Sequence, residues 1–295
     1  MSSAGRNRVL ITGAGGQLGR ELSGTVPPGW VALPYTSAEL DVSRAEMVAD
    51  VLGREHPSLV INAAAYTQVD AAEREPELAE AVNARGAGHV AEECRRLGAR
   101  LIHLSTDYVF DGTQGRPYLP GDFPHPLGVY GRTKLMGERE VTRLSGGNAL
   151  ILRTAWLYSK QGRNFVLTML RHLMERDEIG VVCDQVGTPT WCRSLAEAVW
   201  AAAERPCLKG LHHWTDDGVA SWYDFAVAIQ EEARALGYLR RAVPIRRLLT
   251  AEYPTAAPRP AYSVLDASAT SAALELPRRN WRSSLRLMMQ GLGHA

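Results

Sequence analysis

Near its start the chain reads Arg8-Val9-Leu10-Ile11-Thr12-Gly13-Ala14-Gly15-Gly16-Gln17-Leu18-Gly19, and this stretch decides the fold. Residues 8–11 predict a short buried strand, and a helix is expected to begin near Gln17. The loop between them places glycines at positions 13, 16 and 19. Such a loop turns tightly and presents backbone N–H groups and the positive end of the helix dipole to a phosphate. Glycines also serve plain turns, so the strand–loop–helix context carries the prediction of a dinucleotide site.

Outward from this loop, strands and helices alternate through the first half of the chain. The predicted strands are 8–11, 30–33, 59–62, 100–104 and 149–153, and the predicted helices begin near 17 and cover 43–54, 75–97 and 130–144. Apolar strands joined through helices indicate a parallel sheet covered on both faces. The second half is less regular, with helices over 164–175, 195–203, 222–236 and 282–292, a strand over 210–214 and a proline-rich loop over 251–262. We expect it to pack as a lobe beside the sheet.

The composition excludes several classes of partner. The 295 residues carry 33 basic and 32 acidic side chains, a net charge of +1, so no strong field favours nucleic acid or a membrane. No apolar stretch approaches the roughly 20 residues of a membrane helix, and residues 1–8 lack the features of a signal peptide. Cys94, Cys183, Cys192 and Cys207 form no C-x-x-C pair, so we expect reduced thiols in a cytoplasmic protein.

Tyr130 and Lys134 lie four residues apart, on one face of a predicted helix. An ammonium group beside a phenol stabilises the phenolate, and this would lower the tyrosine pKa from about 10. Thr106, after the strand 100–104, can hydrogen-bond a carbonyl oxygen. As a hydride reaches the carbonyl carbon, Tyr130 would deliver the proton and Thr106 would hold the developing charge. The three residues, in this order after the glycine loop, predict a carbonyl reductase.

The end of the second strand usually distinguishes NAD from NADP, through a carboxylate or a basic residue respectively. This chain has Pro34-Tyr35-Thr36-Ser37 there, which is neither. No negative charge in this stretch repels a 2′-phosphate, so we expect NADPH, with NADH as the alternative.

More specific strings occur further along the chain. They are Asn62-Ala63-Ala64-Ala65, Ser105-Thr106-Asp107-Tyr108-Val109-Phe110-Asp111-Gly112, Tyr130-Gly131-Arg132-Thr133-Lys134, Gly137-Glu138, Arg153-Thr154-Ala155-Trp156-Leu157-Tyr158, Asn164-Phe165, Asp184-Gln185-x-Gly187-x-Pro189-Thr190 and Arg259-Pro260-x-x-Ser263. The glycine spacing is similar to that of the extended short-chain dehydrogenase/reductases. Together, over about residues 8–290, the strings resemble the dTDP-4-dehydrorhamnose reductase family.

The resemblance implies an α/β fold, a Rossmann-type doubly wound parallel sheet with a smaller, interleaved C-terminal substrate lobe. Residues 1–156 and about 188–206 would form the dinucleotide-binding domain, and about 157–187 and 207–295 the sugar-nucleotide lobe. It also implies reduction of the 4-keto group of dTDP-4-dehydro-L-rhamnose by NADPH or NADH.

Carried over residue by residue, the family's catalytic trio is Thr106, Tyr130 and Lys134. The matching cofactor contacts are Gly13, Gly16, Gln17, Leu18, Gly19, Asp41, Val42, Ala63, Ala64, Ala65, Leu104, Tyr130 and Lys134. The matching substrate contacts are Thr106, Asp107, Tyr130, Trp156, Asn164 and Arg259. Three alternatives stay open: Asp41 as a helix cap, Trp156 as a buried aromatic residue, and Arg259 in a surface or core salt bridge.

Some family members dimerise around magnesium held by acidic side chains. Glu21 is present here, but Trp191-Cys192-Arg193 stands where those members present a carboxylate. Because an arginine repels a cation, we expect no metal and a monomer or weak homodimer.

Three other functions are consistent with parts of the pattern. A sugar-nucleotide dehydratase or epimerase is disfavoured because Tyr108, not a second acid, follows Asp107. A non-catalytic regulatory subunit, as of methionine adenosyltransferase, is disfavoured by the complete trio. A reductase of another dTDP-4-keto-6-deoxysugar in antibiotic biosynthesis shares all these motifs and stays open.

Overall fold

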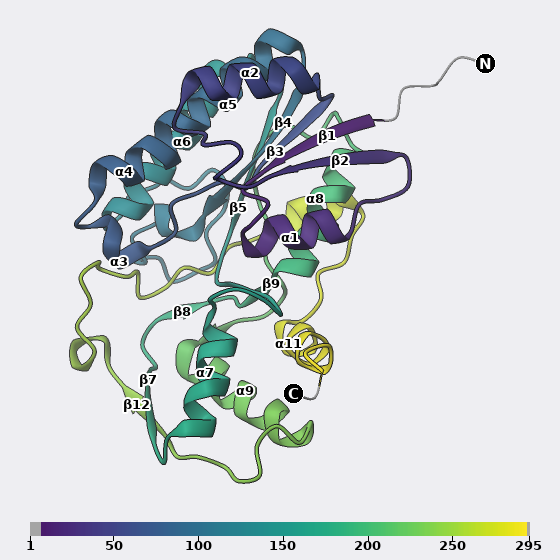
Figure 1. Cartoon of the computed structure of the whole chain (residues 1–295). Coiled ribbons are helices and arrows are strands. Elements are labelled where there is room, and N and C mark those ends of the chain that lie inside the picture. Colours follow the sequence, from purple (N-terminus) through teal and green to yellow (C-terminus); the bar gives the residue numbers. More distant parts are fainter. Residues whose placement is uncertain (1–6, 294–295) are drawn as a thin grey trace.

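A six-stranded parallel sheet in the order β10-β5-β4-β3-β1-β2 forms the centre of the computed structural model, which describes residues 7–293 (Figure 1). Its strands are β1 (Asn7–Thr12), β2 (Trp30–Tyr35), β3 (Leu59–Asn62), β4 (Arg100–Thr106), β5 (Ala149–Thr154) and β10 (Gly210–His213). The sheet confirms the predicted Rossmann-type fold. The expectation that the chain starts without a signal peptide falls largely on residues 1–6, outside the described residues.

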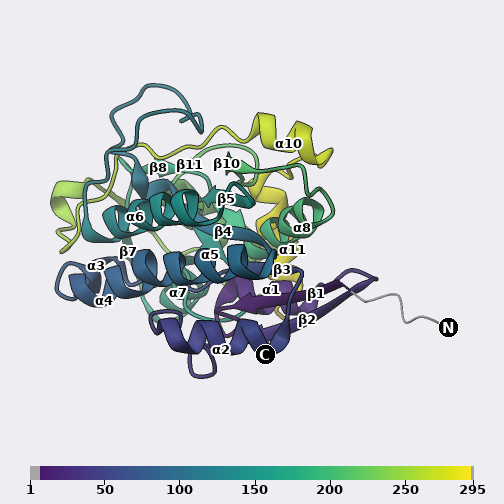
Figure 2. The same cartoon turned by 90° about the horizontal axis from the view of Figure 1, so that it is seen from above.

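Helices cover both faces of this sheet (Figures 1 and 2). One face holds α1 (Gln17–Gly24) and α8 (Cys192–Ala203), and the other holds α2 (Ala45–Glu55), α5 (Gly86–Leu97) and α6 (Val129–Leu144). Because successive strand residues point to opposite faces, Val9 and Ile11 pack against the first pair while Leu10 packs against the second group. No helix of residues 7–293 has the length and apolar character needed to cross a membrane.

The strand order reverses between β1 and β3, and this positions the site. At such a switch point the loops leave the two strands in opposite directions and open a crevice at their carboxyl ends. The Thr12 hydroxyl donates to Asn62 Oδ1 at 2.7 Å across the two strand ends. Gly13 follows with a φ of +66°, and a Cβ there would lie 2.7 Å from the Ala63 carbonyl oxygen. The glycine is therefore required by both its backbone angle and its surroundings.

The predicted helix over 75–97 is interrupted in the structure. It divides into α4 (Pro76–Glu80), a π-helical turn η1 (Ala81–Arg85) and α5. Within the turn, the Asn83 side chain accepts from the Tyr66 N–H at 2.8 Å and donates to Thr133 Oγ1 at 3.1 Å. A Cβ on Gly137 of α6 would lie 2.1 Å from the Asn83 carbonyl oxygen, so the two helices meet backbone to backbone. Helical periodicity alone does not show such a bulge.

The second lobe has its own core around Phe225 and Trp281. Its elements are β6 (Leu157–Tyr158), α7 (Phe165–Glu175), β7 (Ile179–Val182), β8 (Val186–Gly187), β9 (Thr190–Trp191), β11 (Ala220–Ser221), α9 (Trp222–Ala235), β12 (Ile245–Leu248) and α11 (Trp281–Gln290). Small two-stranded pairings, β6 with β9, β8 with β11 and β7 with β12, tie these elements together. Short helices at α3 (Val69–Ala72), η2 (Asp107–Val109), η3 (Thr250–Glu252) and α10 (Ser268–Leu274) complete the chain.

Part of the segment expected in this lobe lies with the sheet instead. The sequence places all of 207–295 in the lobe, but β10 pairs in parallel with β5 and forms the sheet edge. Leu274 of α10 packs into the core beneath α1 and α8. This placement depends on the pairing of a four-residue edge strand with a strand far away in the sequence. Such a short strand has little local sequence signal.

We expect Gly137→Ala to destabilise the protein, because the new methyl group would overlap the Asn83 carbonyl oxygen and push the π-helical turn η1 away from α6. Overpacking of this kind costs about 1–3 kcal/mol, measurable by thermal or denaturant unfolding. The matched control is Gly53→Ala in α2, where the added Cβ meets only the Arg96 Nη2 at 3.6 Å. That helical substitution should be neutral or stabilising. Equal stability of the two variants would contradict the packing argument.

Candidate functional site

The candidate site is a cavity of about 800 Å³ at the carboxyl ends of the strands. Its lining residues are Gly13, Gly15, Gly16, Gln17, Leu18, Gly19, Thr36, Ser37, Leu40, Asp41, Val42, Ala63, Ala64, Ala65, Tyr66, Thr67, Val69, Val82, Leu104, Ser105, Thr106, Asp107, Tyr130, Lys134, Thr154, Ala155, Trp156, Leu157, Arg163 and Trp222. The structure thus brings together every residue predicted to contact the cofactor and the whole catalytic trio. Four of the six predicted substrate residues also line the cavity: Thr106, Asp107, Tyr130 and Trp156.

The glycine loop forms one end of this cavity. Gly16 is the N-cap of α1 and supplies no side-chain hydrogen bond, so the first N–H groups of the helix are left for a ligand. A Cβ on Gly19 would lie 2.3 Å from the Gly13 carbonyl oxygen, so the loop can pack this closely onto the helix only without side chains. Arg163, which the sequence analysis did not single out, lines the same cavity and adds a positive charge. These features fit a dinucleotide pyrophosphate.

Thr36, Ser37, Leu40, Asp41 and Val42 line the cavity beyond the end of β2. The alternative prediction for Asp41, a helix cap, is wrong, because the N-cap of α2 is Arg44 and no side chain caps that helix. Asp41 Oδ1 instead accepts from the backbone N–H of Ser43 at 2.9 Å, before the helix begins. Glu39, absent from the lining, accepts from the Thr36 N–H at 2.9 Å and from its hydroxyl at 2.8 Å. A carboxylate therefore does lie close to this region, although the sequence pattern at the strand end showed none.

Lys134 lies fully buried between α6 and β4, where its Nζ donates to the Leu104 carbonyl oxygen at 2.7 Å. Burial lowers the lysine pKa to about 8, and the nearby charge of Glu138 opposes that shift. The ammonium is still predominantly charged at neutral pH. Its position is fixed by a backbone atom of the neighbouring strand.

Tyr130 does not show the lowered pKa that the sequence suggested. Burial raises its pKa to about 12, a hydrogen bond with Thr106 lowers it in part, and the charge of Asp107 raises it further. The prediction was wrong in direction, because desolvation of the phenolate outweighs any stabilisation by the ammonium. The phenol is therefore protonated at neutral pH, as a proton donor must be.

Thr106 and Asp107 lie together where β4 ends. The Thr106 hydroxyl donates to Asp107 Oδ1 at 3.0 Å and accepts from the Tyr108 N–H at 3.2 Å. Burial raises the pKa of Asp107 to about 6, against hydrogen bonds with Ser263 and Thr106 that lower it. Two polar side chains are thus held beside the phenol of Tyr130.

Trp156 lies at the entrance to the second lobe in a left-handed backbone conformation with a φ of +47°. Its ring stacks on Trp222 with centroids 3.5 Å apart and planes within 3°. A Cβ on Gly187 would lie 2.6 Å from Trp156 Cε2, so this glycine makes room for the ring. Both indoles line the cavity, where they form an aromatic wall. No local motif signals Trp222, because it reaches the site only through the packing of α9 on α7.

Asn164 and Arg259 are not among the cavity-lining residues. Asn164 caps α7 by accepting from the Leu167 N–H at 3.1 Å, and it donates to Gln17 Oε1 at 3.0 Å. Arg259 donates to both carboxylate oxygens of Asp70, at 2.8 and 2.7 Å, and holds the pKa of Asp70 near 2. For Arg259 the structure supports the alternative prediction, a salt bridge.

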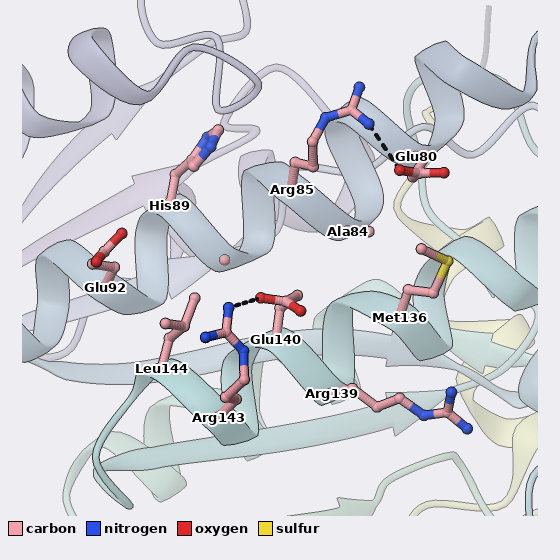
Figure 3. A pocket seen from close by; sticks show the side chains of 11 residues that line it. Glu80, Ala84, Arg85, His89, Glu92, Met136, Arg139, Glu140, Arg143 and Leu144 are labelled. Carbon is pink, nitrogen blue, oxygen red and sulfur yellow. Dashed lines mark hydrogen bonds and ion pairs between the residues drawn. The ribbon is translucent and has the colours of Figure 1, made fainter.

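A second cavity of about 480 Å³ lies in the groove between α5 and α6 (Figure 3). Charged side chains line much of it, and some are paired: Arg85 with Glu80 and Arg143 with Glu140. None of the predicted catalytic or ligand-contacting residues lies there. Within residues 7–293 we find no cluster of three side chains suited to a metal ion. Arg193 pairs with Glu197 one turn along α8.

Comparison with known proteins adds an independent finding. Residues 7–293 match the family model described as RmlD substrate binding domain. A dTDP-4-dehydrorhamnose reductase of Aggregatibacter actinomycetemcomitans is 42% identical over 286 residues, 95% of this chain and 97% of that protein. The spore coat polysaccharide biosynthesis protein SpsK of Bacillus subtilis is 40% identical, over 96% of this chain and 97% of its own length.

A solved structure agrees with these matches. The crystal structure of a dTDP-4-dehydrorhamnose reductase from Bacillus anthracis in complex with NADP is similar with a TM-score of 0.92 at 36% identity. The similarity covers 97% of this chain and 99% of that one.

Burial of Asp107 predicts a stability cost that depends on pH. Its pKa rises from 3.8 unfolded to about 6 folded, so ionisation destabilises the fold progressively between these values and the cost persists above pH 6. We expect Asp107→Asn to raise Tm by a few degrees at pH 8 and by less near pH 4.

Asp70 is the control, because its ionisation stabilises the fold whereas that of Asp107 destabilises it. The pKa of Asp70 falls to about 2, so its stabilisation is present above pH 3.8 and is lost as the pH falls towards 2. Asp70→Asn should therefore lower Tm at pH 8. A lower Tm at pH 8 for Asp107→Asn as well would show that hydrogen bonding, and not the cost of a buried charge, dominates at Asp107.

Proposed function

The chain belongs to the RmlD substrate binding domain family, that of the dTDP-4-dehydrorhamnose reductases, and we propose that it reduces the 4-keto group of dTDP-4-dehydro-L-rhamnose to give dTDP-L-rhamnose. The observation that carries this proposal is one cavity holding the glycine loop, the trio Thr106, Tyr130 and Lys134, and the aromatic wall. Its cofactor is NADPH, with NADH as the alternative.

The residues present fit a nicotinamide dinucleotide. At Gly13 and Gly19 a side chain would strike the main chain of the neighbouring loop, so only glycine allows this tight turn at the N-terminus of α1. The N–H groups of that helix end and Arg163 suit a pyrophosphate. When bound, the cofactor supplies the hydride. Lys134, fixed on the Leu104 carbonyl, would hold the ribose hydroxyls nearest the nicotinamide.

Proton delivery falls to Tyr130. Its phenol is protonated at neutral pH, and an alkoxide formed from the sugar carbonyl is a stronger base than a phenolate, so the proton moves from Tyr130 to the sugar oxygen. The phenolate left behind would lie one helical turn from the charged Lys134, whose ammonium would stabilise it. The Thr106 hydroxyl donates to the same sugar oxygen while charge builds on it.

Asp107 and the Trp156–Trp222 wall are our proposed contacts for the sugar. A carboxylate can accept from sugar hydroxyls, and an aromatic ring packs against the apolar face and methyl group of a 6-deoxy sugar. Asn164 and Arg259 act more indirectly in this proposal. Asn164 ties Gln17 to the second lobe, and Arg259 anchors the 251–262 loop on Asp70 beside the site.

We further infer a cytoplasmic monomer or weak homodimer that needs no metal, nucleic acid or membrane. The balanced net charge of +1 argues against a nucleic-acid or membrane partner. The four free thiols suit a reducing compartment such as the cytoplasm. Trp191-Cys192-Arg193, where magnesium-binding relatives would have a carboxylate, supports the expected absence of metal. Reduction of another dTDP-4-keto-6-deoxysugar is the second candidate, because the similarity to SpsK extends the family to a spore coat polysaccharide protein.

Purified protein should oxidise NADPH with dTDP-4-dehydro-L-rhamnose, measured by nicotinamide absorbance and identification of the sugar product. Tyr130→Phe should lower kcat by about 10²–10⁴-fold, because the proton donor is lost, while NADPH still binds. Tyr108→Phe is the matched control. The Tyr108 ring packs edge-on against Tyr130 with the two ring centroids 5.7 Å apart, but Tyr108 does not line the cavity. It should retain most activity.

The outcomes separate the alternatives. No turnover with any dTDP-4-keto sugar would favour a regulatory protein, and faster turnover of a different keto sugar would favour the antibiotic-type reductase. Loss of NADPH binding in Tyr130→Phe would make Tyr130 a structural residue. Activity should survive a chelator.

Glu39 makes the coenzyme preference testable. Its carboxylate binds Thr36 at the end of β2, where a 2′-phosphate would be read. Glu39→Gln should raise the NADPH-to-NADH ratio of kcat/KM about threefold at low salt, since one screened repulsion is removed. Glu178→Gln, in an exposed pair with Arg246, controls for net charge. An unchanged ratio would place the 2′-position away from Glu39.

A further inference from the structure

A buried ion pair lies one helical turn beyond Lys134. Arg153 of β5 donates from Nε and Nη2 to the two carboxylate oxygens of Glu138, at 2.8 and 2.7 Å. Ser105 of β4 donates to the same carboxylate at 2.5 Å. Arg153 is 1% and Glu138 is 4% exposed, so the cluster is almost free of solvent.

Stability alone is a poor reason for such a pair. Burying two charges costs several kcal/mol per ion, and replacing a buried pair with apolar side chains is often neutral or stabilising. The cluster does, however, join three elements beside the reaction centre. Ser105 precedes Thr106, Arg153 precedes the cavity-lining Thr154, and Glu138 follows Lys134 by four residues on the buried face of α6.

We propose that Glu138, held by Arg153 and Ser105, is a positioning residue for Lys134: its carboxylate keeps the buried ammonium charged and ties α6 to the ends of β4 and β5. Side chains four apart on a helix are neighbours, about 5–6 Å between Cβ atoms. The proposal deepens, and rests on, the role assigned to Lys134 in the proposed function.

The charged and titratable groups around Lys134 come from three elements. From α6 come Tyr130 and Glu138. From β4 comes His103, whose pKa is lowered by burial and by the Lys134 charge, and Asp107 follows at the strand end. From β5 comes Arg153, whose guanidinium is committed to Glu138.

Among these groups, Glu138 is the one whose charge raises the lysine pKa. His103, kept neutral, offers no negative charge. Tyr130 is also neutral while its phenol is protonated. Asp107 is negative above about pH 6, but its charge acts on Tyr130, whereas that of Glu138 acts on Lys134. The carboxylate of Glu138 therefore compensates the buried ammonium, beside the Leu104 carbonyl.

The chain permits a direct test because it contains three lysines, Lys134, Lys160 and Lys209. Protein labelled with ¹³C at lysine Cε gives three signals, and Lys134→Arg identifies one of them. The Lys134 signal should titrate near pH 8 in the full chain. In Glu138→Gln we expect its midpoint to fall by about one pH unit, because an opposite charge has been removed.

Two further variants keep the test decisive. Because Glu138→Gln leaves Arg153 buried without its partner, the double variant Glu138→Gln/Arg153→Met, which removes both charges, guards against a loss of folding. The Lys134 midpoint should fall there too, by a smaller amount. Glu140→Gln, on the same helix but in the exposed pair with Arg143 (Figure 3), should leave it unchanged. An unmoved Lys134 midpoint in a folded Glu138 variant overturns the proposal and leaves the pair a structural tie.

Kinetics supplies the second readout. The alkaline limb of kcat against pH should move to lower pH by the same amount as the NMR midpoint, whereas a purely structural tie would change Tm without moving that limb. If the unmodified protein reduces no dTDP-4-keto sugar, the proposed function fails, and the NMR titration still decides the role of Glu138.

Discussion

A lysine ammonium that must stay charged away from water is the constraint on which this site depends. Lys134 reaches the Leu104 carbonyl from α6, and desolvation there disfavours its charged form. The carboxylate of Glu138, on the same helix, compensates this ammonium. Arg153 of β5 and Ser105 of β4 donate hydrogen bonds to that carboxylate. Apolar packing would serve the fold as well, so in our proposal this polar cluster is kept for the charge of Lys134 and not for stability.

Close approach of backbones positions the catalytic helix. A Cβ on Gly131 would lie 2.1 Å from the Tyr108 carbonyl oxygen, and one on Gly137 would lie 2.1 Å from that of Asn83. These glycines stand on either side of Lys134 in α6, so the helix is pressed against both η2 and the π-helical turn. The same device, at Gly13 and Gly19, sets the cofactor end of the cavity. Position in this site is fixed by main chain against main chain, which tolerates little displacement.

The substrate side is built differently. The second lobe supplies Trp222, which stacks on Trp156 where the chain leaves the sheet domain. The hydrogen bond from Asn164 to Gln17 links that lobe to the glycine-loop helix. In the proposed function, this bond joins the cofactor end of the cavity to the lobe that carries the aromatic wall.

The sequence by itself determined the parallel sheet, the glycine loop and the trio Thr106, Tyr130 and Lys134, because each rests on a local signal: strand-length apolar runs, a fixed glycine spacing, or two side chains one helical turn apart. Only the tertiary structure decided which groups surround them. Trp222 and Arg163 reach the cavity through packing, and Arg259 meets Asp70 across 189 positions of the chain. It also decided the protonation of Tyr130, since burial outweighs the ammonium, and the edge placement of β10. Burial and long-range pairing arise only when distant segments pack, so no local pattern encodes them.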